Sequence, residues 1–190
     1  INSSALRLHR LVENYLTYVR IQSLMVDTKR LANIRRQVCG NPHIAAEHQA
    51  IYVAQRTHRE GDLSLRHGQP AAVHIAEHDL NKVMDEILDN AFKFSDPGTP
   101  IILQTGIEHF EGEDRFCIRL TDYGRGMSPE QIQGVGAYMQ FDRILYEQQG
   151  SGLGLTISRG LTEMYEGIIR IESEPNDYLT VTLAFKIAHA

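Results

Sequence analysis

The first 26 residues carry apolar side chains at alternating spacings of three and four. The series consists of Ala5, Leu8, Val12, Tyr15, Val19 and Val26, with Gln22 interrupting it. Such spacing gathers apolar side chains on one face of an α-helix, as in a coiled coil. Leu11, Leu16 and Leu24 widen this face and favour a helix bundle over a two-stranded coil. We therefore expect a helix over 5–26 that needs partners to bury its apolar face.

The rest of the chain mixes helical and strand-like patterns. A polar, basic stretch ends at the turn Gly40-Asn41-Pro42, so a domain boundary is expected there. Beyond it the pattern predicts helices at 42–59, 79–94 and 153–165, and strands at 63–66, 71–75, 101–107, 115–121, 168–173 and 178–187, with a polar loop at 108–114. Without strict strand–helix–strand alternation, this order favours an α+β two-layer sandwich preceded by a bundle-forming helix.

Composition and charge exclude several classes of protein. Nineteen lysines and arginines stand against 24 aspartates and glutamates, without a basic stripe, so no nucleic-acid partner is expected. Cys39 and Cys117 lack metal-ligand spacing, which predicts reduced structural thiols and a cytoplasmic location. Without a long apolar run, this piece should make no direct membrane contact. Because the chain begins at Ile1, we expect an excerpt of a longer protein that could be anchored upstream.

Three polar residues share one face of the helix predicted at 79–94. Glu86, Asn90 and Lys93 lie at i, i+4 and i+7, within about 60° of one another and opposite the apolar side. They offer a carboxylate that can accept a proton, an amide oxygen for a hard cation and an ammonium for phosphate. Taken alone, such a face is more often merely solvated.

Two glycine-rich motifs follow this helix. Asp122-Tyr123-Gly124-Arg125-Gly126-Met127 comes directly after an apolar strand, where the carboxylate could bind an exocyclic amine and the glycines could admit a flat ring. Alone, this motif would more often be a turn. Gly150-Ser151-Gly152-Leu153-Gly154-Leu155 enters a helix, whose first N–H groups can receive phosphate. No Gly-Lys-Ser/Thr follows, so this is not a P-loop.

Together these stretches resemble the GHKL superfamily of Bergerat-fold ATPases, and most closely the catalytic domains of histidine kinases. The segment from Glu86 to Phe94 resembles the N box, Asp122 to Gly126 the first glycine box, Phe141-Asp142-Arg143 the F box and Gly150 to Leu155 the second glycine box. The four motifs occur in the family's order and spacing. The resemblance covers about residues 44–187.

The resemblance implies a role for each matching residue. Asn90 would be the magnesium ligand, Lys93 a phosphate contact and Asp122 the acceptor for the adenine amine, so ATP and Mg²⁺ are the implied cofactors. Gly124 and Gly126 would line the adenine pocket, Gly150, Gly152 and Gly154 would shape the phosphate loop, and Arg143 would reach the γ-phosphate from a lid over about 128–150. The implied catalytic set is Glu86, Lys93 and Arg143.

Two positions depart from the family pattern. Glu86 stands where many histidine kinases have Asn, as in ATP-hydrolysing relatives such as gyrase, and could polarise water or an incoming nucleophile. The family's Gly-Thr before the last strand is not evident, so Thr180 is given no nucleotide contact.

The leading helix resembles the second helix of the dimerisation and phosphotransfer hairpin. This divides the chain into a partial hairpin at 1–27, a linker at 28–43 and an ATP-binding domain at 44–190. Neither His9 nor His78 has the phosphoacceptor's sequence context, so the acceptor histidine is expected on a helix outside the chain. The resemblance implies a homodimer through the leading helix and a response regulator's receiver domain as partner.

The main hypothesis is therefore a histidine kinase domain that binds Mg-ATP and donates the γ-phosphate to that histidine. Alone, the fragment should bind nucleotide without appreciable autophosphorylation. Three alternatives stay open: an ATP-hydrolysing GHKL enzyme with Glu86 as general base, an anti-sigma-type serine kinase, and a nucleotide-sensing docking module.

Overall fold

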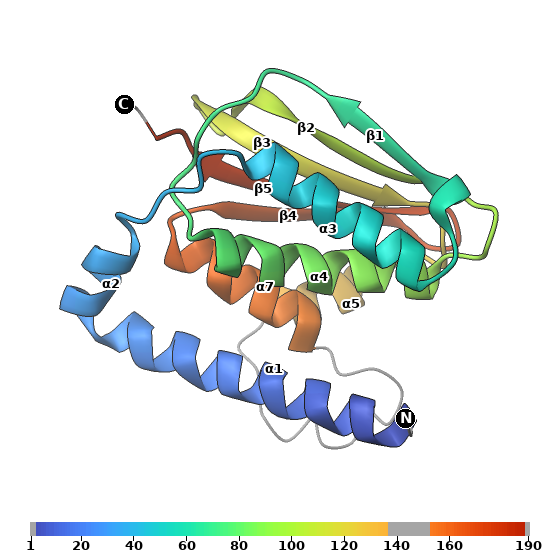
Figure 1. The fold of residues 1–190 in the computed structure, drawn as a ribbon, viewed down its shortest axis with the longest axis horizontal. Helices are drawn as coiled ribbons and strands as arrows, with labels where there is room; N and C mark the ends of the chain where they lie inside the picture. Colours follow the sequence, from blue (N-terminus) through green and yellow to red (C-terminus); the bar gives the residue numbers. More distant parts are fainter. Residues whose placement is uncertain (1–2, 137–152, 189–190) are drawn as a thin grey trace.

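The chain forms the α+β two-layer sandwich that its sequence predicts, with one additional helix against the helical layer (Figure 1). The computed structural model describes residues 3–136 and 153–188. The helices are α1 (Ser3–Val26), α2 (Thr28–Ile34), α3 (Pro42–Arg56), the 3₁₀ turn η1 (Glu60–Asp62), α4 (Glu77–Phe94), α5 (Pro129–Gly136) and α7 (Leu153–Met164). The strands are β1 (Leu63–His67), β2 (Ile101–Phe110), β3 (Glu113–Asp122), β4 (Ile168–Glu174) and β5 (Tyr178–Lys186).

The five strands form one mixed sheet in the order β1-β2-β3-β5-β4. β1 runs parallel to β2, and every other pair is antiparallel. A tight turn joins β2 to β3, with Glu111 at φ 51° and Gly112 at φ 91°. Paired positive φ values match the twist of the flanking strands. The hairpin therefore extends strand pairing into the stretch 108–114 that the sequence predicts as a loop.

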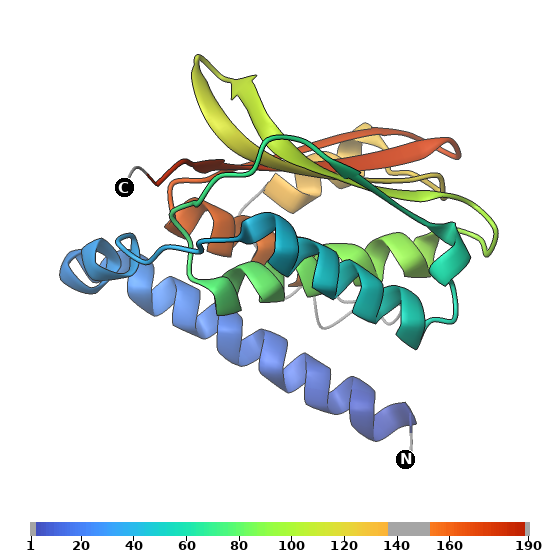
Figure 2. The same cartoon turned by 45° about the horizontal axis from the view of Figure 1, so that its top comes forward.

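Helices α3, α4 and α7 cover one face of this sheet (Figures 1 and 2). The apolar side of α4 faces inward, as its period predicts, and alternate residues of β3 and β5 meet it from the sheet. The buried residues include Leu80, Val83, Met84, Ile87, Leu88, Phe116, Ile118, Leu120, Val181, Leu183 and Phe185. Burying this apolar area is the main force that holds the two layers together.

Three segments differ from the sequence-based expectations. The strand predicted at 71–75 is reduced to isolated bridges, in which Val73 pairs with Cys39 and Ile187 before the chain turns into α4. The predicted linker contains α2, because the Asp27 side chain caps its first turn by accepting from the Arg30 N–H. α5 occupies the start of the predicted lid. The remainder of that lid, which includes Arg143, the F box and Gly150, lies outside the described residues, and so does Gly152.

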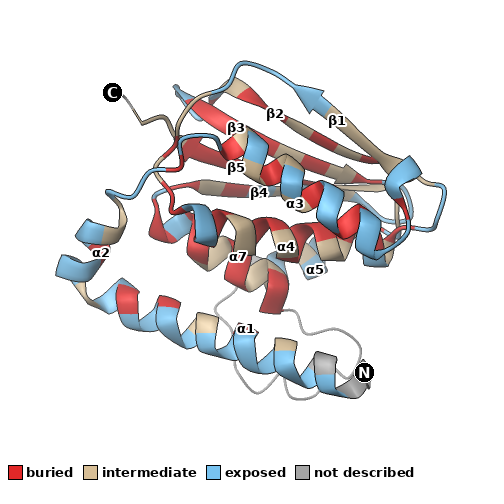
Figure 3. Ribbon diagram, viewed as in Figure 1, coloured by how far each residue is buried: buried red, intermediate tan, exposed pale blue. Residues whose placement is uncertain are grey.

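α1 forms a third layer against the outer side of the helical layer (Figure 2). Its inward face carries Asn14, Ile21 and Leu24, which are buried. α7 approaches α1 closely at Gly160, where an added Cβ would lie 3.1 Å from Ile21 Cγ2. The apolar seam that the sequence predicts faces away from the domain instead (Figure 3), with Leu8 63% and Leu16 60% exposed.

Both cysteines are buried free thiols, in agreement with the structural role predicted for them. Burial is the main cause that raises the pKa of Cys117 to about 11. Among the described residues, no helix is both long enough and apolar enough to span a bilayer.

Candidate functional site

On the polar face of α4, solvent exposure increases from Glu86 to Lys93. Glu86 is only 3% exposed, Asn90 is half-buried and Lys93 is exposed. Lys82, one turn before Glu86, donates from Nζ to Glu86 Oε1 at 2.7 Å and to Asn14 Oδ1 of α1 at 2.7 Å. A merely solvated helix surface is therefore the wrong interpretation for Glu86, because a buried carboxylate needs such a partner.

α1 supplies a second cation to the same carboxylate. The Arg10 guanidinium lies 3.4 Å from Glu86 Oε2 and also pairs with Asp89. Both oxygens of Glu86 are thus engaged by positively charged groups. The acceptor sites of this carboxylate are thus occupied by groups of the protein.

The start of α7 packs directly against the N-box residues. A Cβ added to Gly154 would lie 2.5 Å from Glu86 Oε2 and 3.5 Å from Asn90 Nδ2, so a larger residue would touch Asn90 and displace the Glu86 carboxylate. The N-terminal end of a helix carries partial positive charge and free N–H groups, which suit an anion. The fold thereby brings the described end of the second glycine box to the two polar residues of α4.

Asp122 ends β3 with its carboxyl buried, at 4% exposure. Burial raises the pKa of this carboxyl to about 6, against the smaller lowering effects of the Gly124 N–H bond and the Arg59 charge. The Gly124 N–H donates to Asp122 Oδ1 at 3.1 Å. This leaves acceptor capacity on a buried carboxylate at the end of the central strand of the sheet.

The glycine loop after Asp122 is fixed on two sides. A Cβ on Gly124 would lie 2.2 Å from the Phe94 carbonyl oxygen, and the Arg125 N–H donates to that oxygen at 3.1 Å. On the other side, Gly126 adopts φ +60° with its Cα beside the Glu174 carbonyl. Both glycines are needed because the loop lies close to the end of α4 and to the β4–β5 turn.

Two cations stack on one aromatic ring beside this loop. The Arg125 guanidinium carbon lies 3.8 Å, and Lys93 Nζ 4.9 Å, from the centre of the Phe94 ring. Both side chains are exposed. Their positive charge at the end of α4 is complementary to a polyanionic ligand.

Thr180 lies away from these groups. It pairs with Thr121 across the β3–β5 ladder, and the two hydroxyls lie 2.9 Å apart. Because successive side chains of a strand alternate, Thr180 faces the side of the sheet opposite to Asp122. This placement gives no support to a nucleotide contact for Thr180.

The donor set fits a magnesium ion that arrives with phosphate groups. The described residues contain no cluster of three or more His, Cys, Asp or Glu side chains that could hold a metal. Mg²⁺ is commonly held by few protein ligands, the phosphates and water supplying the others. The half-buried Asn90 amide, beside Gly154 at the start of α7, is compatible with that arrangement.

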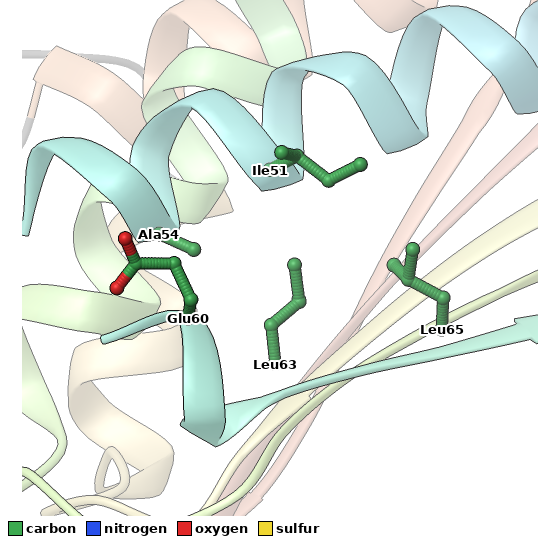
Figure 4. A pocket seen from close by; sticks show the side chains of 5 residues that line it. All are labelled: Ile51, Ala54, Glu60, Leu63 and Leu65. Atoms are coloured by element: carbon green, nitrogen blue, oxygen red, sulfur yellow. The ribbon is translucent and has the colours of Figure 1, made fainter. Parts of the chain in front are cut away.

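Two shallow hollows lie elsewhere. One, of about 330 Å³, separates α1 from α4 and is lined by Glu13, Leu16, Thr17 and Lys82. The other, of about 220 Å³, lies between α3 and β1 and is lined by Ile51, Ala54, Glu60, Leu63 and Leu65 (Figure 4). The second is apolar with one acidic residue, and the cation of the first is already paired. Neither has donors for a triphosphate.

Lys82 and Arg10 belong to none of the sequence motifs, although both contact Glu86. Lys82 stands four residues before Glu86, and this helical spacing could have revealed the pair. Arg10 has no comparable signal, because it reaches Glu86 only through the docking of α1.

Comparison with known proteins agrees with this geometry. Residues 75–189 match the model of the histidine kinase-, DNA gyrase B-, and HSP90-like ATPase family. The signal transduction histidine-protein kinase ArlS of Staphylococcus epidermidis is 24% identical over 88% of this chain, and the sensor histidine kinase YcbM of Bacillus subtilis is 32% identical over 62%. The chain covers 37% of each of these relatives.

Solved structures agree on the fold. The Acinetobacter baumannii histidine kinase AdeS superposes with a TM-score of 0.66 at 14% identity, covering 97% of this chain and 81% of AdeS. The mycobacterial sensor histidine kinase MprB gives 0.59 at 21% identity, covering 80% of this chain and 99% of that one. Because the family model matches residues 75–189, more than half of its length, the chain belongs to the histidine kinase-, DNA gyrase B-, and HSP90-like ATPase family.

Proposed function

We propose that this domain binds Mg-ATP and donates the γ-phosphate to a histidine on a helix outside the chain, for relay to a response regulator's receiver domain. The observation that supports this proposal most directly is the contact of Gly154 with Glu86 and Asn90. It joins the start of α7, which suits phosphate, to the amide that suits a hard cation.

Each site residue has a place in this proposal. Asp122 accepts the adenine amine, and the backbone of Gly124 and Gly126 leaves room for the ring. Asn90 holds magnesium, whose charge offsets that of the phosphates. Lys93 contacts phosphate from the exposed end of α4. The protein's contribution is positioning and charge stabilisation, because phosphoryl transfer leaves it little covalent work.

The leading helix supports the kinase hypothesis over the alternatives. Its outward apolar face includes Leu8, Leu11, Val12, Leu16 and Val19, all at least 44% exposed. In the proposal this face packs against the other hairpin helix and a second copy of the chain. His9 and His78 lack the phosphoacceptor's sequence context, so the proposal gives neither of them that role.

ATP hydrolysis with Glu86 as general base is the second candidate. The burial of Glu86 beside Gly154 favours it. The ion pairs with Lys82 and Arg10 oppose it while α1 is docked, because they occupy the oxygens that would take the proton. We therefore place phosphotransfer first.

Incubating the full-length parent protein with γ-labelled ATP separates these functions. Acid-labile, base-stable label on the protein supports histidine phosphorylation, whereas acid-stable label indicates a serine kinase. Release of phosphate without any labelled protein would replace the kinase proposal by hydrolysis.

A glycine substitution tests the site within this chain. Gly154→Ala should weaken Mg-ATP binding about tenfold or more, because the added methyl overlaps the Glu86 carboxylate and fills the space beside the Asn90 amide. Gly40→Ala is the matched control, since its Cβ would meet no atom within 4 Å and Gly40 lies in the turn before α3, outside the site. Equal affinities for the two variants would remove Gly154 from the site.

A further inference from the structure

Arg59 is a buried arginine that no motif includes. It follows α3, and its side chain is 8% exposed. Its guanidinium donates to the Phe92 carbonyl at 2.8 Å, to the Ser95 carbonyl at 3.0 Å and to the Asp96 carbonyl at 2.7 Å. These are carbonyls at and just beyond the end of α4, where a helix leaves acceptors unpaired and favours a cation.

A carboxylate completes this cluster. Asp62 Oδ2 accepts from Arg59 Nε at 2.6 Å and from the Gly98 N–H at 3.0 Å, so it ties the loop after α4 to the same guanidinium. The Phe92 ring also lies under Arg59, with its centre 5.3 Å from the guanidinium carbon. Arg59 therefore fixes the chain from Phe92 to Gly98 by contacts from several directions.

The Phe94 carbonyl lies within the same stretch of chain but contacts the glycine loop after β3 and not Arg59. Phe94 O accepts from the Arg125 N–H and is in close contact with Gly124, whose own N–H binds Asp122. Figure 1 shows α3, α4 and β3 ending at the same side of the molecule. The contacts thus run from Arg59 through the end of α4 to the loop that carries Asp122.

We propose that Arg59 is a positioning residue of the nucleotide site, which holds the end of α4 so that the Phe94 carbonyl keeps the 124–126 loop in place beside Asp122. This inference rests on the proposed nucleotide-binding function. Arg59 contacts no part of the ligand itself. Its planar fork is required because lysine cannot reach several carbonyls in fixed directions.

The charges around Asp122 offer a readout that a purely structural role would not change. Its cross-strand neighbours, Ile101 and Leu179, are apolar. Lys93 and Arg125 lie on the Phe94 ring at the exposed end of α4. Arg59 lowers the pKa of Asp122 by its charge, against the larger effect of burial. Removing that charge should raise the pH at which nucleotide binding is half-maximal.

The test measures the affinity of a ribose-labelled fluorescent ATP with magnesium for Arg59→Lys and Arg59→Gln between about pH 5 and pH 8. We expect Arg59→Lys to weaken binding about tenfold with an unchanged pH midpoint, and Arg59→Gln to weaken it more and to shift the midpoint upward. Titration of the ligand is common to all variants and cancels in the comparison. Thermal melting confirms that each variant is folded.

Arg115→Gln is the matched control, because Arg115 is similarly buried but lies near the start of β3, at the end opposite to Asp122. It should lower stability without changing affinity more than about twofold. Asp122→Ala tests the function separately. If Asp122→Ala loses binding while folded Arg59→Gln matches Arg115→Gln in affinity and midpoint, the inference about Arg59 is wrong and the nucleotide site stands. If Asp122→Ala binds as the wild type does, the proposed site itself fails, and the inference fails with it.

Discussion

Two buried carboxylates lie in different regions of the molecule and differ in how many protein groups bind them. Asp79, at the junction of α1, α4 and α7, is 2% exposed and accepts from Arg20 at 3.0 and 3.2 Å and from the Tyr165 hydroxyl at 2.7 Å. Asp122, at the end of β3, is 4% exposed, and among the described residues its hydrogen-bond donor is the Gly124 N–H. The two carboxylates are therefore about equally buried, but Asp79 has more hydrogen-bond and ion-pair partners within the protein than Asp122.

The difference indicates different roles. A carboxylate with a cation, a hydroxyl and the start of a helix around it is satisfied within the protein and joins three elements. A carboxylate buried with little compensation costs stability and is kept where a ligand completes its hydrogen bonds. The cost appears as the raised pKa of Asp122. The predictions below follow from this comparison.

Removing the satisfied carboxylate should have the largest effect. Asp79→Ala leaves Arg20 and Tyr165 without their acceptor, and we expect the free energy of unfolding to fall by about 3 to 5 kcal/mol. Urea denaturation measures the loss. Asp177→Ala, at an exposed turn, is the control and should change stability by less than about 0.5 kcal/mol. A similar small change for Asp79→Ala would show that the junction does not depend on it.

Neutralising Asp122 should raise the free energy of unfolding, whereas removing Asp79 should lower it. With a folded pKa of about 6 against the ordinary value of 3.8, Asp122 binds its proton more tightly in the folded state, so its ionisation destabilises the fold increasingly between pH 4 and pH 6. The full penalty is present above pH 6 and absent below about pH 4.

Asp122→Asn should therefore raise the free energy of unfolding by about 1 to 3 kcal/mol at pH 7.5, less at pH 5, and weaken nucleotide binding at the same time. Denaturation at both pH values and an ATP-binding titration test this. A variant that is less stable at pH 7.5, or that binds ATP as the wild type does, would contradict the functional interpretation of Asp122.

Loosening α1 should have a smaller effect. Arg20→Ala removes the cation of the junction but leaves the Tyr165 bond to Asp79, so we expect a loss of about 1 to 2 kcal/mol. Hydrogen exchange should become faster in α1 and stay unchanged in β3 and β5. Arg30→Ala, which alters a pair at an exposed surface, should leave both unchanged. Uniformly faster exchange would mean that α1 is an integral part of the core.

The smallest effect is expected from one hydroxyl. Burial and the Asp79 charge raise the pKa of Tyr165, so it stays protonated and donates at any ordinary pH. Tyr165→Phe should lower the free energy of unfolding by about 1 kcal/mol in thermal or urea denaturation. Tyr52→Phe, whose ring is exposed, should cost less than about 0.5 kcal/mol. Equal values for both would mean that Arg20 alone satisfies Asp79.

Local patterns in the sequence were sufficient to predict most of the fold. α1, α4, α7 and the strands β2 to β5 begin and end within a few residues of the predicted bounds, because periodic apolar positions and turn residues act over short stretches. The exception at 71–75 has buried Val73 and Ile75 but forms only bridges, since its pairing depends on distant Cys39 and Ile187. The roles of Asn90, Lys93, Asp122 and the described glycines remain predictions.

What the sequence determined by itself is the family, through four motifs in order, and the position of each polar group on its helix or strand. Only the tertiary structure decided which of these groups meet. It turned the seam of α1 away from the domain, placed Arg10 and Lys82 on Glu86, and brought Arg59 to the end of α4. Helical period defines a face but not its neighbour, because ion pairs between distant segments depend on packing that no short stretch of chain encodes.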